Sequence, residues 1–148
     1  MTGEPLKLLA QDADDLLLIS AALQDGIVKL ADVAYAPAAR TLTFPLSRFR
    51  WECETPSRAD AAVQFGDVLD VKARNLSRDR AAACPLLAIE FTPDEEPPGG
   101  VLMLRFAGCG DLKVTVECVD AALVDIGEPR PAQIAPEHPT FDLGDGQI

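Results

Sequence analysis

Arginine side chains are the residues of this chain whose type and spacing best suit chemistry, namely the recognition of anionic groups. The chain has 24 acidic and 13 basic residues and a formal net charge of −11, yet Arg48 and Arg50 stand close together in the stretch PLSRFRWE. A planar guanidinium can donate two parallel hydrogen bonds to one carboxylate or phosphate. The candidate binding residues are the cations that we expect on outward strand faces: Arg48, Arg50, Lys72, Arg74 and Arg105.

The sequence lacks the usual catalytic and metal-binding motifs. The only histidine, His138, lies in the proline-rich stretch APEHPTF, so a histidine-based triad would have to recruit that segment. Glycine-rich nucleotide loops, catalytic serine elbows and zinc-protease motifs are not present. Neighbouring carboxylates such as Glu52 and Glu54 are common on any acidic surface. We therefore predict no catalytic residues, no metal site and no cofactor.

The four cysteines are spaced too widely for a CxxC redox or zinc motif. They stand 31, 25 and 9 residues apart, at Cys53, Cys84, Cys109 and Cys118. We expect reduced, buried thiols, because the amino terminus shows no secretory signal and the protein is predicted to be cytoplasmic. Cys109 stands between two glycines and is the most exposed candidate for reactivity.

The amino-terminal region predicts a short strand over 6–10 followed by a helix over 11–26. Asp12 is placed to cap the helix and Gly26 to end it. One apolar stripe should pack on a sheet, because it recurs at helical spacing: Leu16, Ile19 and Leu23.

Alternating apolar residues predict strands through most of the remaining chain. A hairpin is expected from 27–35 and 41–52, a kinked strand over 63–75, and three further strands over 84–91, 101–108 and 112–119. A short helix should follow over 120–127. The predicted fold is α+β: a mostly antiparallel curled sheet or partly closed barrel of six to seven strands with one N-terminal helix and a short C-terminal helix. We predict a single domain over 5–126 and a proline-rich arm or tail over 127–148.

The strand over 41–52 changes its apolar parity near Ser47. A β-bulge at this point would bring its apolar side chains onto one inward face: Leu42, Phe44, Leu46, Phe49 and Trp51. Pro45 is compatible with a bulge or an edge strand. In this interpretation Arg48 and Arg50 point outward.

Pairing of this strand with the one over 63–75 would join the outward cations into one face. Arg48 and Arg50 would then lie beside Lys72 and Arg74. The face is either a solvated ladder, balanced by carboxylates such as Asp70, or a recognition surface.

Two functions stay open on this evidence. The first is a non-enzymatic cytosolic module that recognises a protein partner or forms a homodimer through a β face or sheet edge. The alternative is an anionic small-molecule-binding protein or unclassified enzyme using arginines at the mouth of the sheet. Duplex DNA is excluded by the net negative charge, and a membrane span by the absence of a long apolar stretch. Single-stranded RNA would need exposed aromatics, whereas Phe49 and Trp51 are expected inside.

Several blocks of the sequence resemble a known family. They are LKLLAQDADDLLLISAALQDGIVK, RFRWE, LLAIEF, VLMLRFAGCGDLKVTVECVDAALVDIG and PEHPTFD, in this order between about Leu6 and Asp142. The chain resembles a family of short bacterial proteins classed as a domain of unknown function. The resemblance implies no assigned activity, and it implies that the domain is complete and that the block containing His138 belongs to its pattern.

Overall fold

The chain folds mainly into β-strands. The computed structural model describes residues 6–51, 53–79, 81–127 and 129–131. Within them are one α-helix, α1 (Ala13–Leu23), and a short 3-10 helix, η1 (Leu30–Asp32). The strands are β1 (Lys7–Ala10), β2 (Ile27–Lys29), β3 (Ala34–Ala36), β4 (Thr41–Phe49), β5 (Ser57–Phe65), β6 (Val68–Arg74), β7 (Ala83–Pro93), β8 (Gly100–Phe106), β9 (Gly110–Val116), β10 (Ala121–Asp125) and β11 (Arg130–Pro131).

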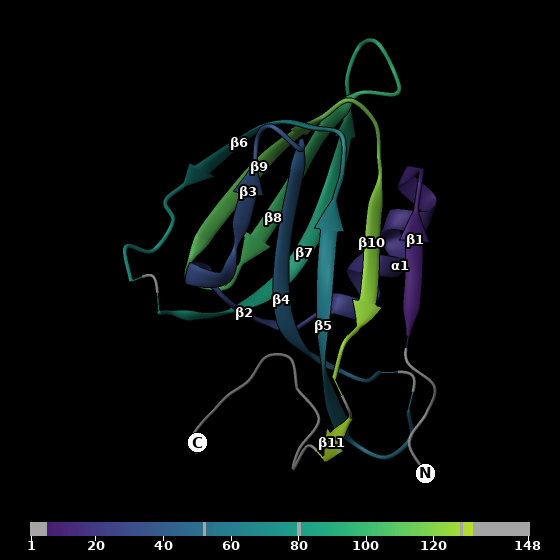
Figure 1. Cartoon of the computed structure of the whole chain (residues 1–148), viewed down its shortest axis with the longest axis vertical. Coiled ribbons are helices and arrows are strands. Elements are labelled where there is room, and N and C mark those ends of the chain that lie inside the picture. Colours follow the sequence, from purple (N-terminus) through teal and green to yellow (C-terminus); the bar gives the residue numbers. More distant parts are fainter. Residues whose placement is uncertain (1–5, 52, 80, 128, 132–148) are drawn as a thin grey trace.

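These strands form one curled, open sheet (Figure 1). Their order is β1-β10-β5-β4-β2-β7-β8-β9-β6, with β3 also beside β4 and β11 beside β5. Every neighbouring pair is antiparallel. The predicted α+β class with a mostly antiparallel sheet and an N-terminal helix is therefore confirmed. The strands outnumber the predicted six to seven, and the described sheet does not close because β1 and β6 lie at its two ends.

The sheet has two halves that face each other across one core. Strands β1, β10, β5 and β4 form one half, β7, β8, β9 and β6 form the other, and β2 pairs with both β4 and β7. The chain passes from the first half to the second between β5 and β6, where Asp67 has a φ of 54°. The predicted kink at this position is confirmed, because a left-handed residue turns the backbone sharply. Helix α1 packs between β1 and β7 at the open side of the curl.

Helix α1 begins and packs as its sequence predicts. The Asp12 side chain accepts a hydrogen bond from the Asp15 N–H at 2.8 Å, and the apolar stripe over Leu16, Ile19 and Leu23 is buried. At the other end of the helix, Asp25 rather than Gly26 takes the left-handed conformation, with a φ of 63°. Gly26 is needed for space instead, because a Cβ there would meet the Leu46 side chain.

Helix α1 also supplies a hydrogen bond to the edge of β7. Beyond its short pairing with β2, the edge of β7 that faces away from β8 meets the helix rather than another strand. The Ser20 hydroxyl accepts a hydrogen bond from the Ile89 N–H at 3.1 Å. The helix therefore supplies both apolar cover and a polar contact to this edge.

Three predicted elements are wrong in detail. The single kinked strand expected over 63–75 is the end of β5 and the whole of β6, which pair with different strands. The strand expected over 27–35 is divided by η1 into β2 and β3. The short C-terminal helix expected over 120–127 is strand β10, which pairs with β1 and β5. In β10 the residues Ala121 and Leu123 alternate inward, and pairing on both sides outweighs the weak local preference of the stretch for a helix turn.

The cysteines differ from the expectation of four reduced thiols. Cys84 and Cys109 form a disulfide with a Cα–Cα distance of 6.1 Å, whereas Cys53 and Cys118 are free. Cys84 lies at the start of β7, and Cys109 lies in the turn between β8 and β9. The bond therefore joins the open end of the β7–β8 hairpin to the turn of the β8–β9 hairpin. Cys109 is buried and bonded, which contradicts its predicted reactivity as a thiol.

Among the described residues, no helix is long and apolar enough to cross a membrane. The predicted arm over 127–148 lies mostly outside the described residues, and His138 lies outside them entirely. Of this stretch, β11 pairs with β5.

Candidate functional site

Arg48 and Arg50 point into the protein, which contradicts the predicted outward orientation. Strand β4 pairs with β5 in unbroken register from Leu42 to Phe49, without the bulge expected near Ser47. The inward parity of Leu42 therefore continues through Arg48, whose side chain is 0% exposed, and Arg50 is 4% exposed. Pro45 needs no bulge, because on its other side β4 pairs with β3 before it and with β2 after it.

Arg48 forms an ion pair with Asp125 inside the fold. Its Nε and Nη2 donate to the two carboxylate oxygens at 2.7 and 2.8 Å, and Asp125 also accepts the Leu6 N–H at 2.8 Å. Burial alone raises the pKa of Asp125, but the hydrogen bonds from Arg48 and Leu6 outweigh this effect and hold its pKa below the ordinary 3.8. The pair links β4, β10 and the residue before β1, so the Arg48 guanidinium is buried and is not available to a partner outside the fold.

The Arg48 and Asp125 pair should make stability depend on pH. Because the pKa of Asp125 is lowered by folding, its stabilisation is complete above pH 3.8 and is lost as the pH falls through the lower folded value. We expect the difference in free energy of unfolding between the wild type and Asp125→Asn to shrink from about pH 6 to about pH 3. Urea unfolding at several pH values measures it. A difference that stays constant over this range would contradict the pairing.

Arg50 and Trp51 directly follow the end of β4. Arg50 Nη1 donates to the Ser57 hydroxyl at 3.3 Å, next to the Arg48 pair. Trp51, expected inside, is 40% exposed, stacks edge-on against Phe49 and donates its indole N–H to the Gln24 carbonyl. Since Arg48 and Arg50 are buried, this tryptophan does not combine with them into a surface for single-stranded RNA.

The other three predicted binding residues do share an outward face. The predicted pairing of their strand with the strand of Arg48 is wrong, because β6, which carries Lys72 and Arg74, pairs with β9 and not with β4. Arg74 lies opposite Asp111 on β9, and Asp111 lies opposite Arg105 on β8. The predicted site is thus divided: Arg48 and Arg50 lie inside, and the other three lie on the outer face of the β6-β9-β8-β7 half.

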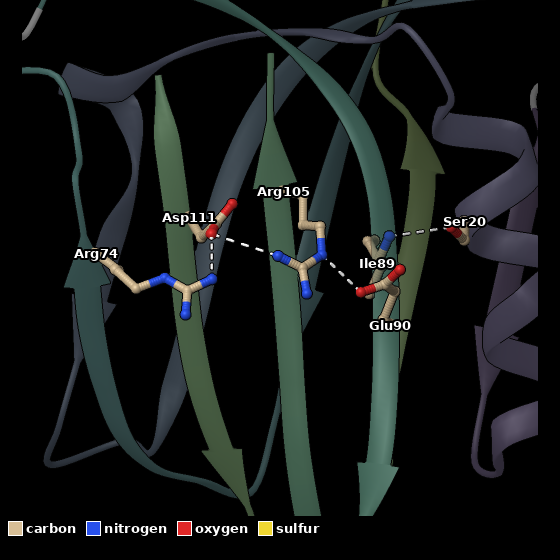
Figure 2. A network of polar contacts seen from close by, with 6 residues as sticks. All are labelled: Ser20, Arg74, Ile89, Glu90, Arg105 and Asp111. Carbon is tan, nitrogen blue, oxygen red and sulfur yellow. Dashed lines mark hydrogen bonds and ion pairs between the residues drawn. The ribbon is translucent and has the colours of Figure 1, made fainter. Parts of the chain in front are cut away.

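A row of alternating charges crosses this face. Arg74 Nη2 contacts Asp111 at 2.8 Å, Arg105 Nη1 contacts the same carboxylate oxygen at 3.4 Å, and Arg105 Nε donates to Glu90 at 2.6 Å. We call Arg74, Asp111, Arg105 and Glu90 the outer ladder; Figure 2 shows that it runs from β6 to β7. The hydrogen bond to Glu90 raises the pKa of Arg105. Arg105 remains 39% exposed, so the ladder is open to a partner.

Lys72 and Lys113 extend this face toward the edge of the sheet. They lie opposite each other on β6 and β9, and both are exposed. Lys72 contacts Asp70 at 3.9 Å. With the ladder, these residues give the outer face four basic and three acidic side chains on a protein whose net charge is −11. The face thus carries a small positive excess on an acidic protein, and it suits a partner of mixed or negative charge.

Two further titratable groups of the described residues, Cys118 and Asp120, have shifted pKa values. Burial, followed by a hydrogen bond to Asp67, raises the pKa of the Cys118 thiol and keeps it protonated at neutral pH. Burial and Asp67 also raise the pKa of Asp120. Among the described residues, no group of histidine, cysteine, aspartate and glutamate side chains is placed to hold a metal.

A groove of about 370 Å³ opens on the outside of β4 and β5. Its charged lining comprises Lys29, Asp32 and Asp60, with Ser47 and Ile126 nearby. One lysine between two carboxylates is not a receptor for an anion. None of the five predicted arginines and lysines lines this groove.

Sequence reasoning missed the acidic partners of the arginines. Asp125 was placed in a helix, and Asp111 in a turn, so neither was considered beside a strand arginine. A signal was present: β4 and β10 each carry a charged residue at the end of a run of alternating apolar residues, with opposite signs. Arg48 follows Leu46, and Asp125 follows Leu123, at a spacing of two. Such residues share the buried face and must pair there.

The fold and the outer ladder define an α+β protein with an open antiparallel sheet, one covering helix and a charged β face. Residues 6–138 match the family described as "Protein of unknown function (DUF2948)". The chain belongs to this family, and its predicted resemblance to a family of unknown function is confirmed. Comparison with curated proteins and with solved structures gives no significant match.

Proposed function

We propose that this protein is a non-enzymatic protein-interaction module that binds its partner through the outer face of the β6-β9-β8-β7 half. The outer ladder carries the proposal, because four charged side chains are held in a row by ion pairs, and three of them, Arg74, Arg105 and Glu90, stay open to solvent. Arginines fixed in this way lose little freedom on binding, and arginine is enriched in interface hot spots. The predicted binding residues Lys72, Arg74 and Arg105 belong to this face, and Arg48 and Arg50 do not.

Binding of an anionic small molecule through the arginines has less support. Arg48 is paired with Asp125, and Arg74 and Arg105 already contact carboxylates on the outer face of the curled sheet. A small anion needs a concave site in which cations converge. Thermal-shift screening with anionic metabolites tests this alternative, since a ligand at 100 times its dissociation constant stabilises the fold by about 2.7 kcal/mol.

The charged face can be tested with a double Arg74→Glu, Arg105→Glu variant. We expect the wild-type protein, immobilised and exposed to lysate of its own cells, to retain a specific protein that the variant loses by more than about tenfold, because both cations are reversed. Quantitative mass spectrometry of the retained proteins at two salt concentrations measures this. A milder Arg74→Gln, Arg105→Gln variant should show a partial loss.

The matched control for this experiment is Lys7→Glu, Lys29→Glu, which changes the net charge equally on other strands. Circular dichroism establishes that each variant is folded. Equal retention by the wild type and by Arg74→Glu, Arg105→Glu would rule out the outer face as the binding surface.

The cytoplasmic location and the bacterial origin stay predictions from the sequence. The Cys84–Cys109 disulfide bears on the location, because such bonds persist mainly in oxidising compartments. Alkylation of thiols in intact cells, before lysis, distinguishes a reduced from an oxidised compartment.

A further inference from the structure

Strand β6 offers an open edge beside the outer face. In the described part of the chain it pairs only with β9, and it forms one end of the strand order. Figure 1 shows β6 at the side of the molecule opposite β1 and α1. Five of its seven residues are exposed. The Val68 N–H at its start donates to the Arg40 carbonyl at 2.9 Å, so the part of the edge that can accept another strand begins at Leu69.

The sequence of β6, VLDVKAR, is self-complementary when two copies run antiparallel with Val71 opposite Val71. Asp70 of each copy then lies opposite Lys72 of the other, which gives two ion pairs on the outer face. Opposite charges facing each other across strands are stabilising, and like charges are destabilising. The pairing is two-fold symmetric, as homodimer interfaces usually are.

Neighbouring registers that keep the outer faces together are less favourable. Centring the pair on Asp70 places two carboxylates opposite each other, and centring it on Lys72 places two ammonium groups opposite each other. Centring on Ala73 brings Lys72 against Arg74 of the other copy. Of these four registers, the one centred on Val71 contains no like-charge pair.

The apolar face of β6 fits the same register. Leu69 is 50% exposed at the irregular start of the strand, where the pairing with β9 shifts. With Val71 at the centre, Leu69 lies opposite Ala73 of the second copy. A large side chain then meets a small one, and the exposed leucine gains a neighbour.

The other end of the sheet lacks these properties. Strand β1 has four residues, and its sequence, KLLA, contains one charge. Two antiparallel copies of β1 therefore have no complementary ion pairs to fix a register. Charge complementarity distinguishes β6 from β1 as a site for a second copy.

We propose that the partner recognised at this face includes a second copy of this chain, bound through antiparallel pairing of β6 with β6 centred on Val71. The two sheets become continuous, with Arg74 of each copy opposite Val68 of the other, so the outer ladders of both copies lie on one continuous face at opposite ends of the paired strands. This inference rests on the proposed interaction function and specifies its partner. An edge contact within one short strand is small, so the dimer is weak and concentration-dependent.

The test is a charge exchange between two variants. Lys72→Asp places two aspartates opposite two aspartates, and Asp70→Lys places two lysines opposite two lysines. Sedimentation velocity over a wide concentration range measures the mass of each. We expect the wild type to approach twice its 15.8 kDa mass at high concentration, and each variant to dimerise at least about tenfold more weakly.

Mixing the two variants supplies the decisive result. A Lys72→Asp chain beside an Asp70→Lys chain regains two opposite-charge pairs, so the equimolar mixture should dimerise as the wild type does. Lys7→Asp on β1 is the matched control and should leave the wild-type dimer unchanged. A wild type that stays monomeric at all concentrations would overturn the inference, as would a dimer that both variants leave intact.

The two proposals fail separately. A monomeric wild type that still retains a lysate protein through Arg74 and Arg105 contradicts the β6 dimer and keeps the proposed function. A monomeric wild type that retains nothing contradicts both.

Discussion

Replacing Arg48 by methionine is expected to lower the free energy of unfolding by about 3 to 5 kcal/mol. The substitution keeps the length and apolar stem of the side chain but removes both hydrogen bonds to Asp125. The Asp125 carboxylate, 5% exposed, is then buried without its partner. A buried carboxylate in this position must either stay charged at high cost or take up a proton. Urea unfolding followed by circular dichroism measures the loss.

A second substitution separates the charge from the packing. In Arg48→Met, Asp125→Asn no charge remains in the interior, and the amide oxygen can still accept the Leu6 N–H. We expect this double variant to regain about half or more of the lost stability, because an unpaired charge costs more than a missing pair. The exposed Lys72→Met serves as a control and should change stability by less than about 0.5 kcal/mol. If Arg48→Met behaved like this control, Arg48 would have to be solvent-exposed after all.

The buried pair shows where sequence reasoning succeeded and failed. The helix was predictable because Asp12 and the stripe through Leu16 are local signals. The inward orientation of Arg48 depended on the register between β4 and β5, which local periodicity does not determine. The predicted bulge near Ser47 would bring Phe49 and Trp51 inside, but it places both arginines on the wrong face, and β4 contains no such bulge. Half-exposed Trp51 was the acceptable alternative, since aromatic rings are often only partly buried.

The outward orientation of the cations on the outer face was predictable, because it follows from alternation within single strands. Lys72 and Arg74 are outward by simple alternation within β6, and Arg105 is outward within β8. Their neighbours were not predictable, because β6 pairs with β9, about 40 residues later in the chain. Long-range strand order is decided by how the whole core packs, so Asp111 could not be assigned to Arg74 from spacing alone.

Reducing the Cys84–Cys109 disulfide is expected to lower the free energy of unfolding by about 3 kcal/mol. The bond closes a loop across 25 positions of sequence and ties the start of β7 to the turn between β8 and β9. Without the bond the unfolded chain gains conformational entropy. The folded chain loses a covalent link at the start of β7, where β7 pairs with β2. Urea unfolding with and without a thiol reductant measures the effect.

The free cysteines provide the control for this experiment. A Cys53→Ser, Cys118→Ser variant keeps the bonded pair, so its stability should fall on reduction by the same amount as that of the wild type. Cys84→Ala, Cys109→Ala should be insensitive to the reductant. Alkylation of the denatured, unreduced protein should modify two of the four cysteines and, after reduction, all four. Modification of all four before reduction would show that the bond is absent. In that case β7 and the β8–β9 turn would be held together by their hydrogen bonds and packing alone, and the wild type would be as insensitive to the reductant as the alanine variant.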